Sequence, residues 1–328
     1  MVLLHGLTAS DPSGITGATA WVFLSSVEYL DRISPQAVMT QHWFSAKGRE
    51  IHCKGRPLIM GVVNVTRDSF YDGGRYVEPE QAIAHALELV EQGADIIDVG
   101  GESTRPGAHS VSEQDELAHV IPVVKGLVHR VSAPISIDTT KSQVAQRALD
   151  SGASIINDVS ALRQDSEMAS VIARFDAGVV LMHRQGSPQT MQQSPHYSNV
   201  VGEVVHFLEE RVQVALCAGI ARTNIILDPG FGFGKLLVHN IDLLNGLCAF
   251  AALNRPVLVG LSRKAFIGKV VERPVEHREW GTAAAVALAV DRGAHIVRVH
   301  DVAMMIDVVK MAAALNPRWS SCGQEHDA

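Results

Sequence analysis

The sequence predicts a (β/α)8 TIM barrel of the α/β class over residues 57–316. Three observations support this fold class. Eight short apolar runs rich in valine and isoleucine alternate with amphipathic segments, as buried parallel strands alternate with helices. The alternation covers about 260 residues, a typical length for such a barrel. Nearly every run also ends in a polar side chain, and a barrel gathers its strand ends on one face. A doubly wound open sheet, which would spread these groups along an edge, is the alternative fold.

The eight predicted strands follow one another at regular spacing. Each is apolar along its whole length, which is typical of strands covered on both faces. In chain order they are PLIMGVVNV, ADIIDVG, APISID, ASIIND, AGVVLMH, NIILD, RPVLVGLS and AHIVRVH. The polar side chains at their ends are Asn64, Asp98, Asp138, Asn157, His183, Asp228, Ser262, Arg298 and His300.

The predicted helices lie between these strands. They are EPEQAIAHALELVEQG, SEQDELAHVIPVVKGLVHR, KSQVAQRALDSG, a weakly patterned segment at 166–176, NVVGEVVHFLEERVQVALCAG, HNIDLLNGLCAF, REWGTAAAVALAVDRG and VAMMIDVVKMAAAL. Several end at a glycine just before the next strand, as at Gly93, Gly152, Gly219 and Gly293. Glycine is the usual residue at a helix end, so these boundaries agree with the alternation.

Both ends of the chain fall outside the predicted barrel. Residues 1–56 form an N-terminal extension, either a tail or a peripheral helix, and residues 317–328 form a C-terminal tail. The apolar segment ITGATAWVFLSSVEYL has no lysine or arginine before Arg32 and is too polar for a membrane span, so we expect neither export nor insertion. Alternatively, translation starts at Met39, because every recognisable motif follows it.

The composition favours a soluble, globular protein of the cytoplasm. There are 35 acidic and 28 basic residues, a formal charge of −7, and no basic stripe, so nucleic acid and anionic membranes are not expected partners. The cysteines are Cys53, Cys217, Cys248 and Cys322. They show no CxxC spacing, which argues against a zinc site or a disulfide framework and suits a reducing compartment.

The polar residues at the strand ends form two chemical groups. Cationic side chains suit a phosphate or pyrophosphate, although any one of them alone is more often a solvated surface charge. They are Arg105, Lys235, Arg263, Lys264, Arg298 and His300. The acceptors Asp138, Asn157 and Asp228 suit a heterocycle with several N–H groups, although each alone can be a helix cap.

Two further segments bear on the site. DPGFGFGK, residues 228–235, matches neither a Walker A loop nor a dinucleotide fingerprint, and we predict a flexible loop whose phenylalanines can wall a pocket. No HExxH pattern is present, so a metal held by side chains alone is not expected. Asn64, Asp68 and Asp72 offer hard oxygen atoms that can share Mg²⁺ with a diphosphate.

Eight motifs occur together in one order and spacing. They are IMGVVNVTRDSFYDGG, DIIDVGGESTRPGA, SIDTTK, IINDVS, LMHRQG, ILDPGFGFGK, GLSRKAFIG and IVRVHDV. In these the chain resembles the bacterial dihydropteroate synthase family, over about residues 57–315. The resemblance implies a magnesium-assisted transferase that joins 6-hydroxymethyl-7,8-dihydropterin diphosphate to p-aminobenzoate in folate synthesis and is inhibited by sulfonamides. Family members are commonly dimers, so it also implies a homodimer.

The resemblance implies a role for each matching residue. The pterin would be held by Asp138, Asn157, Met182, Asp228, Lys264 and Arg298. The diphosphate would be held by Asn64, Thr104, Arg105, Arg298 and His300, with Asn64 on the magnesium ion. The p-aminobenzoate site would be formed by Phe70, Thr104, Pro106, Phe233 and Ser262. The catalytic residues would be Asp72, Lys264, Arg298 and His300, acting through a dissociative, SN1-like pterin cation.

Two positions depart from the family pattern. Arg67 stands where the family usually has proline, and we expect it to alter closure of the loop at 66–76 rather than the chemistry. Arg184 stands where relatives often carry methionine. Two other functions stay open at this point: a methyltransferase that uses a methyl-folate and a corrinoid, and a non-catalytic homologue that only binds ligand or pairs with a true synthase.

Overall fold

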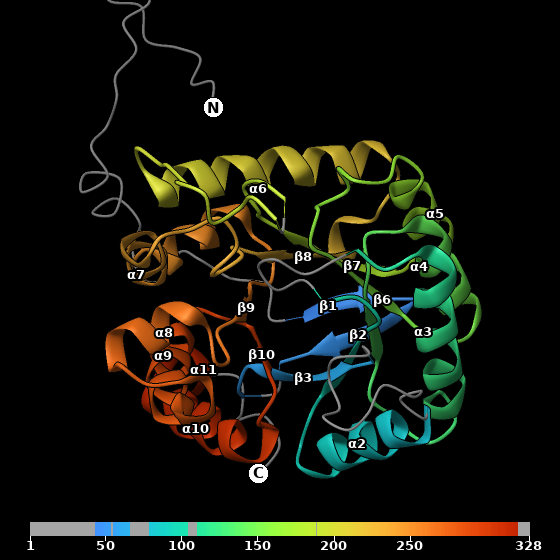
Figure 1. Ribbon diagram of the computed structural model, residues 1–328, viewed down its shortest axis with the longest axis horizontal. Coiled ribbons are helices and arrows are strands. Elements are labelled where there is room, and N and C mark those ends of the chain that lie inside the picture. The colour runs from blue at the N-terminus through green and yellow to red at the C-terminus, as the bar shows by residue number, and fades with distance from the viewer. Residues whose placement is uncertain (1–42, 54, 66–78, 104–109, 188, 321–328) are drawn as a thin grey trace, which may run out of the picture. The chain divides into compact units, whose positions relative to one another are not determined.

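In a computed structural model, the protein is described over residues 43–53, 55–65, 79–103, 110–187 and 189–320. These residues belong to one compact unit, Thr40–Ala328. Eight parallel strands with helices around them confirm the predicted barrel (Figure 1). The strands are β3 Leu58–Asn64, β4 Ile96–Gly100, β5 Ile135–Asp138, β6 Ile155–Asp158, β7 Gly178–Met182, β8 Ile225–Asp228, β9 Leu258–Gly260 and β10 Ile296–Val299.

The order of the strands distinguishes the barrel from an open sheet. They hydrogen-bond in the order β8-β7-β6-β5-β4-β3-β10-β9, so the first and last barrel strands of the chain are neighbours. The remaining gap, between β8 and β9, is bridged where the Leu227 N–H donates to the Pro256 carbonyl over 3.0 Å. The ring is therefore nearly closed, and its strand ends converge as the sequence predicts.

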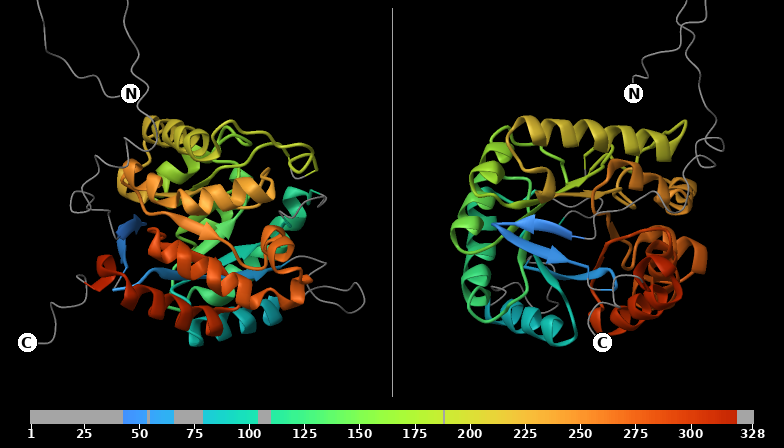
Figure 2. Two further views of the ribbon diagram at one scale, coloured as in Figure 1. Left: turned by 90° about the vertical axis from the view of Figure 1, so that its left-hand side faces the viewer. Right: turned by 180° about the vertical axis from the view of Figure 1, so that it is seen from behind.

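Helices cover the outside of the strands, as the two views in Figure 2 show. They are α2 Pro79–Glu91, α3 Glu113–Leu127, α4 Ser142–Asp150, α5 Met168–Arg174, α6 Val200–Cys217, α7 Leu237–Asn245, α8 Ala265–Val271, α9 Glu279–Asp291, α10 Val302–Leu315 and α11 Pro317–Ser320, with short 3₁₀ turns η1 Arg222–Asn224, η2 Leu247–Leu253 and η3 Val275–His277. The predicted helix at HNIDLLNGLCAF is divided, because α7 ends at Asn245 and η2 follows Gly246. No helix in the described ranges is long and apolar enough to cross a membrane.

The compact unit extends beyond the predicted boundary at residue 57. An antiparallel hairpin, β1 Trp43–Ala46 and β2 Arg49–His52, precedes the barrel. It packs against the barrel because Phe44 and Ala46 are buried and the Lys47 N–H donates to the Asp176 carbonyl over 2.7 Å. At the other end Trp319, which the sequence places in the tail, is buried against His295. The hairpin and the α11 turn thus belong to the barrel body, while residues 1–42, Met39 among them, and 321–328 lie outside the described residues.

Strand register places the polar side chains in one layer. Asp138 on β5 pairs directly with Asn157 on β6, and Met182 on β7 pairs with Asp228 on β8. Below this layer the barrel interior holds apolar side chains without solvent exposure, such as Ile96, which lies on the same face of β4 as Asp98. The apolar interior therefore presents its acceptors only at the carboxyl end of the strands, where TIM barrels carry their sites.

Candidate functional site

One guanidinium group links the strands around the barrel mouth. Arg298 on β10 donates from Nε to Asp98 Oδ2 over 2.7 Å and from Nη2 to Asp138 Oδ2 over 3.0 Å. Asn157 donates from Nδ2 to the same Asp98 oxygen over 3.1 Å. Side chains from β4, β5, β6 and β10 are thereby fixed relative to one another, although they are up to 200 residues apart in sequence.

The protonation states in this cluster follow from burial and charge. Burial raises the pKa of Asp138 to about 7, against the opposing charge of Arg298 and with the help of the nearby Asp98 carboxylate. Burial alone would lower the pKa of Arg298, but Asp98 and Asp138 more than offset this, and its pKa is raised. Arg298 is therefore a permanent cation, whereas Asp138 can exchange a proton near neutral pH.

Several buried acceptors in the cluster have no protein partner. Asp98 Oδ1, Asp138 Oδ1 and Asn157 Oδ1 are inaccessible to solvent and accept no hydrogen bond from the described residues. A buried acceptor without a donor costs free energy, so such atoms are rare unless a ligand supplies the donor. The three oxygens form a wall that fits a flat heterocycle with N–H groups along its edge.

Asp228 adds an acceptor on the other side of the barrel mouth. Its Oδ1 accepts from the Gly230 N–H over 2.7 Å, and its strand neighbour Met182 is buried. Burial raises the pKa of Asp228 to about 6, while the Gly230 N–H and the Lys264 charge oppose the rise. The carboxyl group is thus largely ionised at neutral pH, and Met182 provides an apolar surface beside it.

The segment 228–235 is held in place, contrary to the predicted flexible loop. Gly230 and Gly234 have φ angles of +70° and +64°, and a Cβ at Gly230 would lie 1.9 Å from the His183 carbonyl oxygen. Buried Lys235 donates to His183 Nδ1 over 2.9 Å, the Gly230 carbonyl over 2.8 Å and the Phe233 carbonyl over 3.2 Å. Positive φ and close backbone contact both require glycine, so the glycines here provide fit rather than mobility.

Lys235 is therefore not one of the phosphate-binding cations that the sequence suggested. All three of its N–H donors are used within the segment and by His183. Burial lowers the pKa of Lys235 to about 7, and burial lowers the pKa of His183 to about 2, so the imidazole is neutral and its Nδ1 accepts. The ammonium group fixes Phe233, which lies under Lys264 with 4.3 Å between Nζ and the ring centroid.

We expect Lys235→Met to lower the free energy of unfolding by about 1–3 kcal/mol, because three buried acceptors lose their donor. The same change should raise the KM for an aromatic ligand that packs on Phe233. Urea unfolding and steady-state kinetics measure the two effects. Lys269→Met, which removes an exposed lysine from α8, is the control; equal behaviour of the two variants would contradict this role of Lys235.

The last two strands bring further groups to the mouth. Ser262 Oγ is hydrogen-bonded to His300 Nδ1 over 3.0 Å, which orients the imidazole. The sequence suggested that Arg263 binds a phosphate. In the structure its guanidinium group instead forms two hydrogen bonds with Asp301, of 3.0 and 2.6 Å. Ser262 thus contacts His300, which the family resemblance assigns to the diphosphate site. Its own predicted place in the p-aminobenzoate site stays a prediction.

Some predicted residues cannot be placed in this site. Phe70, Asp72, Thr104, Arg105 and Pro106 lie outside the described residues, as do Arg67 and Asp68. Asn64 is described; it ends β3 beside Gly100 and is half-buried. No role was predicted for Asp98 from the sequence. The available signal was its place near the end of an apolar run, which it shares with Asp138 and Asn157.

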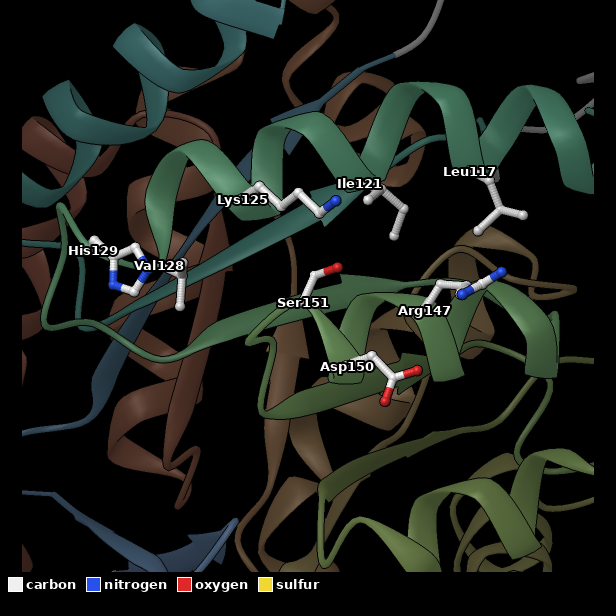
Figure 3. A pocket seen from close by; sticks show the side chains of 8 residues that line it. All are labelled: Leu117, Ile121, Lys125, Val128, His129, Arg147, Asp150 and Ser151. Carbon is white, nitrogen blue, oxygen red and sulfur yellow. The ribbon is translucent and has the colours of Figure 1, made fainter.

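A separate hollow of about 610 Å³ lies on the outside of the barrel, between α3 and α4 (Figure 3). It is lined by Leu117, Ile121, Lys125, Val128, His129, Arg147, Asp150 and Ser151. None of these is a strand-end residue of the barrel mouth. The candidate site is therefore the mouth itself and not this groove.

Comparison with known proteins assigns the family. The model of the pterin-binding enzyme family matches residues 60–300. Dihydropteroate synthase of Haemophilus influenzae is 46% identical over 255 residues, which cover 78% of this chain and 92% of the relative. The chain belongs to the dihydropteroate synthase family.

Solved structures of the family agree in fold. Xanthomonas albilineans dihydropteroate synthase with 4-aminobenzoic acid gives a TM-score of 0.78 at 46% identity, over 84% of this chain and 98% of that one. Yersinia pestis dihydropteroate synthase in a sulfonamide complex gives 0.79 at 40% identity, over 83% and 98%. The family predicted from the eight motifs is confirmed, and with it the TIM barrel.

Proposed function

We propose that this chain is a dihydropteroate synthase, which joins 6-hydroxymethyl-7,8-dihydropterin diphosphate to p-aminobenzoate and releases pyrophosphate. Family membership over residues 60–300 supports this activity. The observation that carries it to individual residues is the set of unpartnered buried acceptors beside Arg298. A transferase of this kind needs an anchored pterin and stabilisation of the departing pyrophosphate, and the barrel mouth offers groups for both.

The pterin fits the acceptor wall of the barrel mouth. Its 2-amino and ring N–H groups would donate to Asp138, Asn157 and Asp228, whose free oxygens otherwise lack donors or are ionised. Met182 would pack on the ring, and Lys264, placed by Phe233, would bond to its polar edge. Arg298 keeps its charge through Asp98 and Asp138, so it can lie over the ring and reach the diphosphate.

Departure of pyrophosphate requires cations near its oxygens. Arg298 is a permanent cation, and Ser262 Oγ orients the His300 imidazole through a hydrogen bond of 3.0 Å. Asn64 offers one hard amide oxygen, which fits a magnesium ion that takes its other ligands from the diphosphate and water. When bound, Mg²⁺ would neutralise charge on the diphosphate. No group of three or more His, Cys, Asp or Glu suited to a metal occurs in the described residues.

The bond between the pterin methylene carbon and the diphosphate oxygen would break first, with both electrons leaving on pyrophosphate. The neutral aniline nitrogen of p-aminobenzoate, aligned beside Phe233, would then bond to the cationic carbon and lose its proton to solvent or pyrophosphate. The ordered 228–235 segment supplies a fixed wall for this step. Asp72, which lies outside the described residues, is proposed to face the cation.

The test is release of pyrophosphate that depends on both substrates and on Mg²⁺, followed by a coupled enzyme assay. A methyltransferase would not release pyrophosphate, and a purely binding homologue would bind pterin diphosphate without turnover. Purified, folded protein that binds the pterin by calorimetry but releases no pyrophosphate would therefore overturn the synthase assignment while leaving a binding function.

A homodimer is our proposal for the assembly. Large apolar side chains are exposed on the adjoining helices α7 to α10, with Trp280 81%, Leu315 73% and Met311 60% accessible. Monomeric proteins rarely expose contiguous apolar surface of this kind. A second copy of the chain would cover it. Cys53, Cys217 and Cys248 form no disulfide among the described residues, and thiols of this kind suit a reducing cytoplasm, where we place the protein.

We expect Trp280→Glu to convert the dimer into monomer, because it places a charge on the face to be buried. Size-exclusion chromatography with light scattering measures the mass. Val214→Glu is the control, since Val214 is also exposed, at 41%, but lies on α6, outside helices α7 to α10. A wild-type protein that is monomeric at micromolar concentration would contradict the proposal.

A further inference from the structure

Three arginines gather on the outer side of the barrel mouth, at strands β6 and β7. Arg163 follows β6, Arg184 follows β7, and Arg211 lies on α6, which covers them. Their charges act on one another: burial lowers the pKa of Arg163, and the charges of Arg184 and Arg211 lower it further. Three like charges in one place require an anion to balance them.

The nearest protein anion does not pair with these arginines. Asp158 is fully buried, and its two oxygens accept from the Ser160 N–H over 2.8 Å and the Leu162 N–H over 2.7 Å. Within 4 Å it forms no ion pair with any described arginine. Glu102 and Glu210 act on Arg184 and Arg211 only at longer range, so none of the three arginines has a direct ion pair among the described residues.

Arg163 serves to hold the other two in position. It donates from Nε to the Ser160 carbonyl over 3.0 Å and from Nη2 to the Arg184 carbonyl over 2.9 Å. Its guanidinium also lies 4.7 Å from the centroid of the Phe207 ring on α6. The loops after β6 and β7 are thereby tied to each other and to α6.

Arg184 and Arg211 are differently placed, because their side chains lack such bonds. Both Nε atoms are buried and have no hydrogen-bond partner among the described residues. Asp158 acts on both at longer range, with Glu102 near Arg184 and Glu210 near Arg211. A buried N–H group without an acceptor costs free energy, so two such donors in one cationic cluster indicate a missing oxyanion.

We propose that Arg184 and Arg211 bind a phosphate-class oxyanion, either inorganic phosphate or pyrophosphate, at a site separate from the Arg298 and His300 cluster. Planar guanidinium groups match the oxygens of phosphate, and a phosphate group has enough oxygens to accept from two arginines at once. The site is separate because alternate residues of a strand point to opposite faces. Asn157 faces the barrel mouth, and its neighbour Asp158 faces outward to the arginines.

The test is isothermal titration calorimetry of the full-length chain with sodium pyrophosphate, and separately with sodium phosphate, without magnesium. We expect two pyrophosphate sites in the wild type. Arg184→Met and Arg211→Met should each weaken one of them by about tenfold or more, as loss of a charge-assisted bond predicts. Arg298→Gln should weaken the other site and leave this one. Whichever of phosphate and pyrophosphate binds the arginine site more tightly is the ligand that we assign to it.

Two further variants keep the test decisive. Arg174→Met is the matched control. Arg174 also lies over an aromatic ring, 5.3 Å from the centroid of Phe175, but it is outside the arginine cluster. This variant should therefore bind both anions like the wild type. Arg184→Lys keeps the charge and removes the planar fork, and it should weaken binding less than Arg184→Met, even if a methionine variant folds poorly. The proposal would be overturned if Arg184→Lys and the folded methionine variants bound both anions with the stoichiometry and affinity of the wild type.

Discussion

Arg298→Gln is expected to lower kcat/KM for dihydropteroate formation by about two to three orders of magnitude, as loss of a preorganised charge at a departing anion typically does. Glutamine keeps hydrogen-bonding groups and removes the positive charge. The loss should be seen in kcat as well as KM, because the charge on pyrophosphate develops mainly in the transition state. The pyrophosphate-release assay measures both parameters.

The same substitution should destabilise the ligand-free protein. Asp98 and Asp138 would remain buried without their cation, and removing one partner of a buried pair costs about 3–5 kcal/mol. The loss should be largest at alkaline pH, where the Asp138 carboxyl group, whose pKa burial raises to about 7, must ionise, and smaller at acid pH, where that group is protonated. Urea unfolding at several pH values measures it.

A second arginine–aspartate pair provides the control. Arg56 bonds to Asp95 over 2.7 and 3.1 Å at the opposite end of the barrel, with side chains 24% and 26% exposed. Arg56→Gln should leave kcat/KM within about twofold of wild type and cost about 1 kcal/mol, as for a partly exposed pair. Equal loss of activity in the two variants would show that Arg298 acts through general stability and not at the substrate.

Asp228→Asn is expected to remove two effects of pH that have opposite directions in the wild type, one on the free energy of unfolding and one on ligand affinity. The pKa of Asp228 is raised by burial from 3.8 to about 6. Because the folded pKa exceeds the unfolded one, the stability that the neutral carboxyl contributes is complete below about pH 4 and is lost as pH rises through 6. Between pH 4 and 8 the wild type should lose about 3 kcal/mol relative to the asparagine variant, from a shift of about two units.

Ligand binding should follow the opposite trend. The ionised carboxylate accepts the N–H groups of the pterin, so affinity should rise more steeply between pH 5 and 8 in the wild type than in Asp228→Asn, where of these two aspartates only Asp138, with a pKa of about 7, still titrates. At pH 8 the variant should bind about tenfold more weakly or worse, since a bond to a charged acceptor is lost. Calorimetry with 6-hydroxymethyl-7,8-dihydropterin, which lacks the titrating diphosphate, measures this. Parallel pH profiles for the two proteins, in stability and in affinity, would contradict the assignment.

The sequence was sufficient for the barrel and for the position of its polar layer, because both depend on local patterns. Apolar runs such as ADIIDVG mark strands, and the carboxyl ends of the strands in a barrel converge at the mouth. The same signal placed Asp138, Asn157, Asp228 and Arg298 at one end, where they are found.

The pairing of those side chains was not predictable from local patterns. Lys235 and Arg263 follow strand ends, as phosphate-binding cations in a barrel do. In the structure, however, Lys235 donates to backbone carbonyls and Arg263 donates to Asp301. Asp98 was left without a role because its partner Arg298 is 200 residues away. The hairpin at β1 and β2 was missed because its burial comes from the barrel and not from its own short strands.

The fixed 228–235 segment has a consequence for the thermodynamics of binding. Its glycines and Lys235 acquire their conformation when the chain folds, so the wall around Phe233 does not lose conformational entropy again in each catalytic cycle. A ligand that contacts this wall should therefore show a smaller entropic penalty than one that must first order a loop. Substitutions within the segment will lower the amount of folded enzyme before they change its selectivity. We therefore expect discrimination between p-aminobenzoate and its mimics to evolve at other residues of the site.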